Sequence, residues 1–227
     1  MTEYKSDTMN FFGNPNVGLF MFVTNKYGLI ASSIKDTDIK QLEKIFGIDL
    51  IQVSVSGTNL VGVFCAGNDD HLFLPSIIHD NELKYIKEKL DGICKVIVLD
   101  TDYTALGNNM ICTKNACLVN PEFEDAAIQE LGKIFDDVVK VKVDGLNNIG
   151  SMIVINSKGL FINHLVKDDE FEIIKKVTGF GEDTIMKSTT NNGNSFVSSG
   201  LVANDKGMLI GDASTGVEMQ DAFTIFG

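Results

Sequence analysis

The segment GLNNIGSMIVINSKGLF, residues 145–161, has a close counterpart in GTNLVGVFCAGNDDHLF, residues 57–73. Both begin with glycine, three residues, an apolar residue and a second glycine. The same pattern fits residues 13–18, and with one change it fits residues 102–107 and 193–198. The second anchor of each pattern falls at residues 18, 62, 107, 150 and 198, at intervals of 43 to 48 residues. Such a fixed period indicates one supersecondary unit that occurs five times.

Each repeat continues with two short apolar stretches on either side of a turn. The first stretches are residues 19–23, 63–66, 110–112, 152–155 and 201–203, and the second are 29–31, 72–75, 117–119, 160–162 and 208–210. Their β-branched and bulky residues favour strands. The residues between them, such as NSKG at 156–159, tolerate the backbone of tight turns. The sequence therefore predicts a β-hairpin in every repeat.

A helix and one more strand follow the hairpin. Apolar residues recur at helical spacing, as in Ile128, Leu131, Ile134 and Phe135, which gives the helix one core-facing side. Acidic residues at the start of the segment suit a helix N-terminus, as at residues 36–38, 80–82 and 168–170. The closing strands are expected at 51–55, 96–99, 138–143 and 184–189. Each unit is thus predicted as strand–strand–helix–strand.

The fifth unit ends with its helix at Gly227 and lacks a closing strand, whereas residues 9–12 stand where the other units carry theirs. We expect this N-terminal strand to complete the fifth unit and close a ring, which would remove the edges of an open array. The predicted fold is an α/β, five-fold pseudosymmetric propeller in a single domain of residues 1–227. Its units are 13–56, 57–101, 102–144, 145–192 and 193–227. The polar residues 1–8 are expected to be mobile.

Composition narrows the classes of partner. The chain has 227 residues, a formal charge of −12 and 19 basic residues, all of them lysine. Without arginine, the usual bidentate reader of guanine and phosphate, sequence-specific binding to DNA is disfavoured. The acidic balance indicates a basic protein partner, or simply serves solubility. No membrane span or signal peptide is indicated, and four irregularly spaced cysteines suit reduced thiols in the cytoplasm.

Several short motifs, in this order and spacing, carry a family resemblance. They are FFGNPNVG at 11–18, GTNLVG at 57–62 with LFLP at 72–75, TALGN at 104–108, NNGNSFV at 191–197 and STGVE at 214–218. With them the chain resembles the translation initiation factor 6 family in its archaeal form. Val217 and Leu165 stand where that family usually has proline. The resemblance implies a pentein-type fold, binding to the intersubunit face of the large ribosomal subunit, and prevention of premature association with the small subunit.

The loops at the anchors are the candidate docking residues, because repeat symmetry should place them in equivalent positions around the ring. The selected residues are Asn16, Asn59, Tyr103, Asn108 and Asn148. Asn108, in TALGN, is the first choice because the resemblance and the loop position coincide there. The alternative is that these polar residues only form turns. The expected partner is the large subunit, mainly through a basic ribosomal protein, with a minor contact to ribosomal RNA left open. No DNA or membrane partner is expected, and the chain is expected to be a monomer.

Pentein folds also occur in guanidino-modifying enzymes that use a nucleophilic cysteine and a histidine, with the cysteine in the last unit. Here the fifth unit has neither residue. Cys65 and Cys112 are placed in first strands, Cys117 in a second strand and Cys94 just before a closing strand, where buried inert thiols are expected. Paired C-x₂-C zinc spacing is absent from the sequence. No catalytic residue, cofactor or metal is therefore expected, and a protein-binding scaffold ring remains a third hypothesis.

Overall fold

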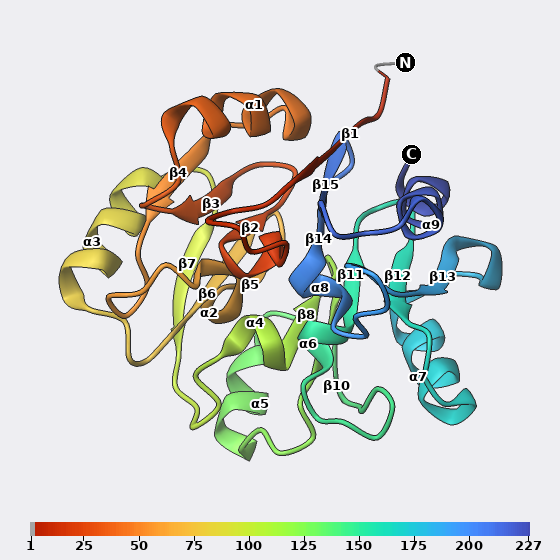
Figure 1. Ribbon diagram of the computed structural model, residues 1–227. Helices are drawn as coiled ribbons and strands as arrows, with labels where there is room; N and C mark the ends of the chain where they lie inside the picture. The colour runs from red at the N-terminus through yellow and green to blue at the C-terminus, as the bar shows by residue number, and fades with distance from the viewer. Residues whose placement is uncertain (1–2) are drawn as a thin grey trace.

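Five three-stranded sheets surround a common axis in the computed structural model, which describes residues 3–227 (Figure 1). The inner strands are β2 (Met21–Val23), β5 (Ala66–Gly67), β8 (Met110–Cys112), β11 (Ile153–Ile155) and β14 (Leu201–Ala203). The middle strands are β3 (Gly28–Ala31), β6 (His71–Pro75), β9 (Ala116–Val119), β12 (Leu160–Asn163) and β15 (Gly207–Gly211). The outer strands are β4 (Leu50–Val53), β7 (Lys95–Leu99), β10 (Asp137–Lys140), β13 (Ile185–Ser188) and β1 (Lys5–Met9). The predicted α/β ring is confirmed.

Strand direction follows one rule in every sheet. The middle strand pairs antiparallel with the inner strand, because a hairpin joins them, and parallel with the outer strand. In the first four sheets a helix crosses over between the middle and outer strands, whereas in the fifth the outer strand is β1 from the other end of the chain. The crossover helices are α1 (Asp36–Phe46), α3 (Asp80–Lys89), α5 (Asp125–Leu131) and α7 (Asp168–Thr178), and α9 (Gly216–Phe226) takes the corresponding place in the fifth unit without leading into a strand. They lie at the periphery of Figure 1. In the described chain, no helix has the length and apolar character needed to cross a membrane.

The hydrophobic core lies between neighbouring units. Leu131 of α5 packs with Phe73 and Leu99, which belong to the sheet of the unit before it. In the same way Phe226 of α9 packs against Phe161 of β12, with ring centroids 6.4 Å apart. Each helix therefore buries its apolar face on the preceding sheet, and the units stabilise one another around the ring.

A ring of five short helices surrounds the axis, and four of them carry labels near the centre of Figure 1. They are η1 (Val17–Leu19), α2 (Val61–Phe64), α4 (Leu106–Asn109), α6 (Ile149–Met152) and α8 (Val197–Gly200), and a further 3₁₀ turn, η2, spans Glu182–Thr184. These segments were expected to be loops or the starts of first strands. Short apolar runs cannot distinguish a strand from one buried helical turn, so β2, β5 and β11 begin later than predicted, whereas β8 and β14 match the predicted 110–112 and 201–203.

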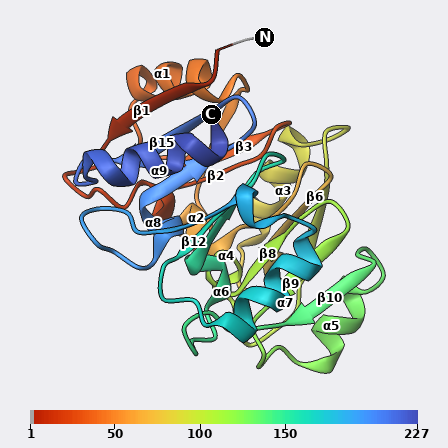
Figure 2. The same cartoon turned by 90° about the vertical axis from the view of Figure 1, so that its right-hand side faces the viewer.

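The strand that closes the ring is β1, which spans Lys5–Met9 and pairs parallel with β15 (Figure 2). The expected strand at 9–12 was therefore placed too late. Residues 10–14 instead form a turn in which Phe12 and Gly13 have φ values of 58° and 75°. The expectation of mobility is wrong for residues 5–8, and residues 1–2 lie outside the described residues. The strand KSDTM lies at a sheet edge and is only partly buried, so its sequence is polar and lacks the apolar pattern that predicts a strand.

Closure of the ring does not remove all sheet edges, contrary to expectation. Each sheet keeps an outer strand at its margin. Charged side chains occur on four of these strands and include Lys5, Asp7, Lys95, Asp137 and Lys187, whereas β4 has none. Charge on an edge strand opposes pairing with another chain.

Candidate docking surface

The loops that lead into the short helices, together with the first turns of the long helices, form one end of the ring, here called the loop face. Three of the five loops have the same backbone, and a fourth, in which Asn191 also has positive φ, is one residue longer. In each, one residue and the glycine after it have positive φ, at Phe12–Gly13, Ser56–Gly57, Asp144–Gly145 and Asn192–Gly193. An isolated β-bridge closes each of these loops, as between Val55 and Thr58. The repeated sequence pattern therefore specifies a repeated turn.

Buried glutamates hold three of these turns in place. Glu82, Glu170 and Glu218 are each the third residue of a long helix. Glu170 accepts hydrogen bonds from the N–H groups of Asp144 and Gly145, at 2.7 and 2.8 Å. Glu82 and Glu218 accept the equivalent pairs of bonds at 2.8–3.0 Å. The acidic residues were expected to cap their helices, and the contact to the loop was not foreseen.

Ionisation of Glu218 stabilises its turn strongly. Burial alone would raise the pKa of this carboxyl group, but the Thr189 hydroxyl and three backbone N–H groups lower it to about 2. The pKa of Glu82 is also lowered, because hydrogen bonds from Ser54 and three backbone N–H groups outweigh the opposing effect of burial. Hydrogen bonds to a carboxylate favour its charged form. These turns are therefore held rigidly at neutral pH.

Three of the five predicted docking residues have partners within the protein. The Asn16 side-chain oxygen accepts a hydrogen bond from the Ser199 hydroxyl at 3.0 Å and so joins the fifth unit to the first. The Asn148 amide donates to the Ser151 hydroxyl at 2.8 Å. The Tyr103 hydroxyl donates to Glu122 at 2.7 Å. These contacts give each residue a local structural role on the loop face.

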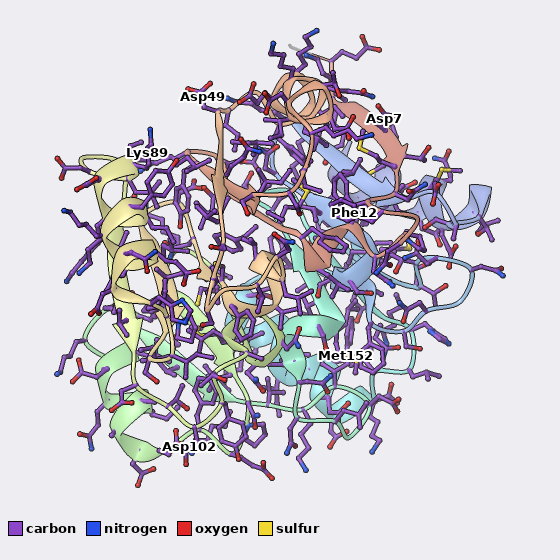
Figure 3. All side chains as sticks on the ribbon, turned by 60° about the vertical axis from the view of Figure 1, so that its left-hand side comes forward. Asp7, Phe12, Asp49, Lys89, Asp102 and Met152 are labelled. Atoms are coloured by element: carbon purple, nitrogen blue, oxygen red, sulfur yellow. The ribbon has the colours of Figure 1, made fainter. Side chains whose placement is uncertain are left out.

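The other two residues are less constrained. Asn59 is exposed, and its only side-chain hydrogen bond within residues 3–227 is a long one of 3.4 Å from the Ser32 hydroxyl. Asn108 lies in the short helix α4 and not in a loop, and its side chain has no hydrogen-bond partner in the described chain. Figure 3 labels Phe12 and Asp102, in two of the five loops, and Met152 at the end of α6. Asn108 is half-buried.

Sequence reasoning missed the exposed apolar residues of this face. Phe12 is 65% exposed and Val217 is 71% exposed, and they are joined by Leu60, Ile77, Leu146, Leu165 and Phe196. Phe12 also packs edge-on against Phe20, with ring centroids 5.8 Å apart. Exposed apolar and aromatic groups near one another are typical of interaction surfaces. The sequence did contain a sign of this surface, because an apolar residue stands inside a turn in FFG at residues 11–13.

A cavity of about 590 Å³ lies on the axis, lined mainly by the inner strands and their turns. Cys65 and Cys112 line it. Cys65 was expected in a first strand, but it follows α2 and precedes β5. Burial raises the pKa of the Cys65 thiol and of the Cys117 thiol, which disfavours the reactive thiolate form.

Two solved structures share the fold at low sequence identity. The N-terminal domain of ArgZ, an arginine dihydrolase from cyanobacteria, has a TM-score of 0.55 and 12% identity, with 86% of this chain and 72% of that chain covered. DDAH from Pseudomonas aeruginosa has a TM-score of 0.53 and 9% identity, with 81% and 71% covered. At these identities the likeness concerns the pentein-type fold alone.

Sequence comparison extends over almost the entire chain. The sequence pattern of the eIF-6 family matches residues 6–223. Translation initiation factor 6 from Saccharolobus islandicus is 32% identical over 213 residues, which cover 93% of this chain and 94% of that protein. Translation initiation factor 6 from Methanocaldococcus jannaschii is 30% identical over 217 residues, with 92% of each chain covered. With its five-unit ring and anchor motifs, this chain belongs to the eIF-6 family of translation initiation factors.

Proposed function

We propose that this protein binds the intersubunit face of the large ribosomal subunit through its loop face and prevents premature association with the small subunit. The observation that carries the proposal is the family match over residues 6–223. The loop face supports it, because buried glutamates fix three of its turns and it carries exposed apolar residues such as Phe12 and Val217. The protein would thus act in the cytoplasm during translation initiation and ribosome biogenesis.

Steric exclusion is sufficient for this function. A disc-shaped protein that occupies one subunit surface blocks the other, and only binding free energy is needed. A specific interface of ordinary size buries roughly 1,600 Å². The charge of −12 and the lack of arginine favour a basic ribosomal protein as the main contact. Any contact to ribosomal RNA is expected to be minor, because an acidic surface gains little binding free energy from counterion release.

The properties of the cysteines agree with a binding role in which no covalent bond is made or broken. The thiols of Cys65 and Cys117 are buried with raised pKa values, and the fifth unit contains no cysteine or histidine. A nucleophilic cysteine needs an accessible thiolate and an adjacent base. This supports a binding protein over a guanidino-modifying enzyme, and a scaffold for another protein is the second alternative.

Co-sedimentation with isolated archaeal subunits over a salt series tests the proposal. We expect the protein to pellet with the large subunit alone and to lower the yield of joined ribosomes. Sedimentation with neither subunit would overturn the proposal and would make an amidine-hydrolysis assay the next measurement.

Substitution of Asn108 tests the placement of the docking surface. We expect Asn108→Phe to weaken binding to the large subunit at least tenfold, because the bulky ring prevents close approach and removes a hydrogen-bonding group. Asn115→Phe is the matched control, since Asn115 is exposed in the hairpin turn of the same unit, at the opposite end of the ring. Equal affinity of the two variants, with unchanged thermal unfolding, would place the docking surface elsewhere.

A further inference from the structure

The axial cavity reaches sideways between the third and fourth units. Its lining in the described chain includes Thr178 and Phe180, which lie at and just after the end of α7. The remaining lining residues belong to the inner strands, their turns and the short helices. No helix-end residue of another unit lines the cavity within residues 3–227. This seam between the third and fourth units therefore differs from the other four.

The first cause of this difference is the lack of a large apolar side chain at the end of α7. In each long helix segment, the residue eleven positions after the N-cap packs into the seam, which is the boundary with the preceding unit. At four seams this residue is large and buried, namely Phe46, Leu90, Phe135 and Phe226. At the seam between the third and fourth units it is Thr178, whose hydroxyl donates to the Ile174 carbonyl at 2.8 Å.

The second cause is a small residue at the start of β9. The strand registers make Ala116 equivalent to Tyr27 and His71. Tyr27 fills its seam and is only 2% exposed. The fourth and fifth units have glycine at this position, but Ile225 and Ile45 of the next helix occupy the space beside it. Beside Ala116 the helix residue equivalent to Ile45 and Ile225 is Val177, which is smaller than isoleucine and only partly buried, and Thr178 follows it.

The third observation is a carbonyl group without a partner. At four seams the carbonyl of the first turn residue accepts a hydrogen bond from a side chain of the preceding unit. The Tyr27 hydroxyl donates to the Asn68 carbonyl. The side-chain amides of Asn68, Asn156 and Asn204 donate to the carbonyls of Thr113, Asn204 and Thr24, respectively. All four distances are 2.8–3.1 Å. The third unit has Thr113 at the donor position. No donor in the described chain reaches the Asn156 carbonyl across this seam.

We propose that this seam is a binding site for a small aromatic molecule that carries a hydrogen-bond donor, such as a phenol or an indole. The ring would take the place of the absent phenylalanine and tyrosine rings, beside Phe180, and the donor would pair with the Asn156 carbonyl. The whole cavity, at about 590 Å³, lies within the size range of small-molecule sites. Aromatic contact with Phe180 and a hydrogen bond to the Asn156 carbonyl both favour such a ligand.

The site is independent of the proposed ribosome binding. The inner strands run from the short helices to the hairpin turns, so Thr113 and Asn156 lie at the opposite end of the ring from the loop face. Occupation of the seam therefore leaves the proposed docking surface accessible, and failure of either proposal is detected by a separate measurement.

Ligand-observed NMR titration of the full chain with phenol, indole and toluene tests the site. Phenol and indole are expected to bind, and toluene, which has no donor, at least fivefold more weakly. Thr178→Phe restores the residue type of three other units and is expected to weaken phenol binding at least tenfold. Thr178→Val keeps the side-chain size and is expected to stay within twofold of wild type. Co-sedimentation with the large subunit should be the same for all of these chains.

A second filling variant guards against misfolding of the first. Ala116→Tyr introduces the tyrosine of the first unit from the other side of the seam and should also abolish phenol binding. The proposal is overturned if wild type binds neither phenol nor indole at millimolar concentration. It is also overturned if a folded filling variant binds phenol like wild type, or if toluene binds as tightly as phenol.

Discussion

Single residues at the axis decide how closely the units approach. A Cβ atom on Gly107 would lie 2.0 Å from the Gly62 carbonyl oxygen, and one on Gly62 would lie 1.8 Å from the Gly18 oxygen. Backbone atoms cannot yield as a flexible side chain does, so any larger residue forces the short helices apart. The anchor glycines are thus required by crowding between units.

We expect Gly107→Ala to destabilise the protein by about 3 kcal/mol, at the upper end of overpacking costs, because the added methyl group meets backbone. The control is Gly216→Ala in the first turn of α9, where nothing lies within 4 Å of the added atom. This change should raise stability by about 0.5–1 kcal/mol through better helix propensity. Urea unfolding measures both, and equal effects would contradict the crowding argument.

The Glu218 carboxylate predicts a pH dependence of stability. Its pKa is about 2 in the folded chain against an ordinary 4.5, so its contribution is present above pH 4.5 and is lost as pH falls toward 2. The difference corresponds to about 3 kcal/mol. We expect Glu218→Gln to lose about that amount at pH 7, because an amide replaces the charged acceptor of five hydrogen bonds, and to lose less than about half of it at pH 3.

The control for that measurement is Glu88→Gln, whose exposed side chain forms only a long ion pair with Lys84. It should change the free energy of unfolding by less than about 0.5 kcal/mol at either pH. A difference between wild type and Glu218→Gln that does not shrink on acidification would exclude ionisation as the cause.

Among the elements, β1 has the largest effect on closure because it comes from the opposite end of the chain. It covers one edge of β15, whose five residues are all buried. The Lys5 N–H donates to the Lys206 carbonyl at 3.1 Å, and the Asp212 N–H donates to Met9 at 3.0 Å. Without β1, a buried strand would present an unpaired edge to solvent.

Deletion of residues 1–9 is therefore expected to cost at least about 3 kcal/mol and to promote aggregation. Deletion of residues 1–3 leaves β1 intact and should have little effect on stability. Thermal unfolding and light scattering of the two truncated chains provide the comparison. Equal stability of the two truncated chains would show that pairing of β1 with β15 does not stabilise the fifth unit.

At the scale of the whole molecule, the charged outer strands and the net charge of −12 should keep the protein monomeric. We expect light scattering to give the mass of one chain over a wide concentration range. Replacement of Asp137 and Lys140 on β10 by valine should cause concentration-dependent association, because the edge becomes apolar. A dimer of the wild-type chain would contradict this prediction.

The sequence alone determined the five units, because their hydrophobic periods, turns and anchor glycines depend on local chemistry. It also identified the family, through motifs in a fixed order. It could not place β1, whose polar residues become a strand only through pairing with β15. Nor could it separate Asn16, which bonds across a seam, from Asn108, which has no partner in the described chain.

Tertiary structure alone decided what forms between units. The glutamate contacts join a helix to a loop about 25 residues away in the chain, a distance at which sequence spacing gives no signal. The gap beside Thr178 becomes visible only when equivalent residues of five units are superposed around the axis. The physical reason is the same in each case: the energy of a contact depends on which groups the closed ring brings together, and closure joins residues that are distant in sequence.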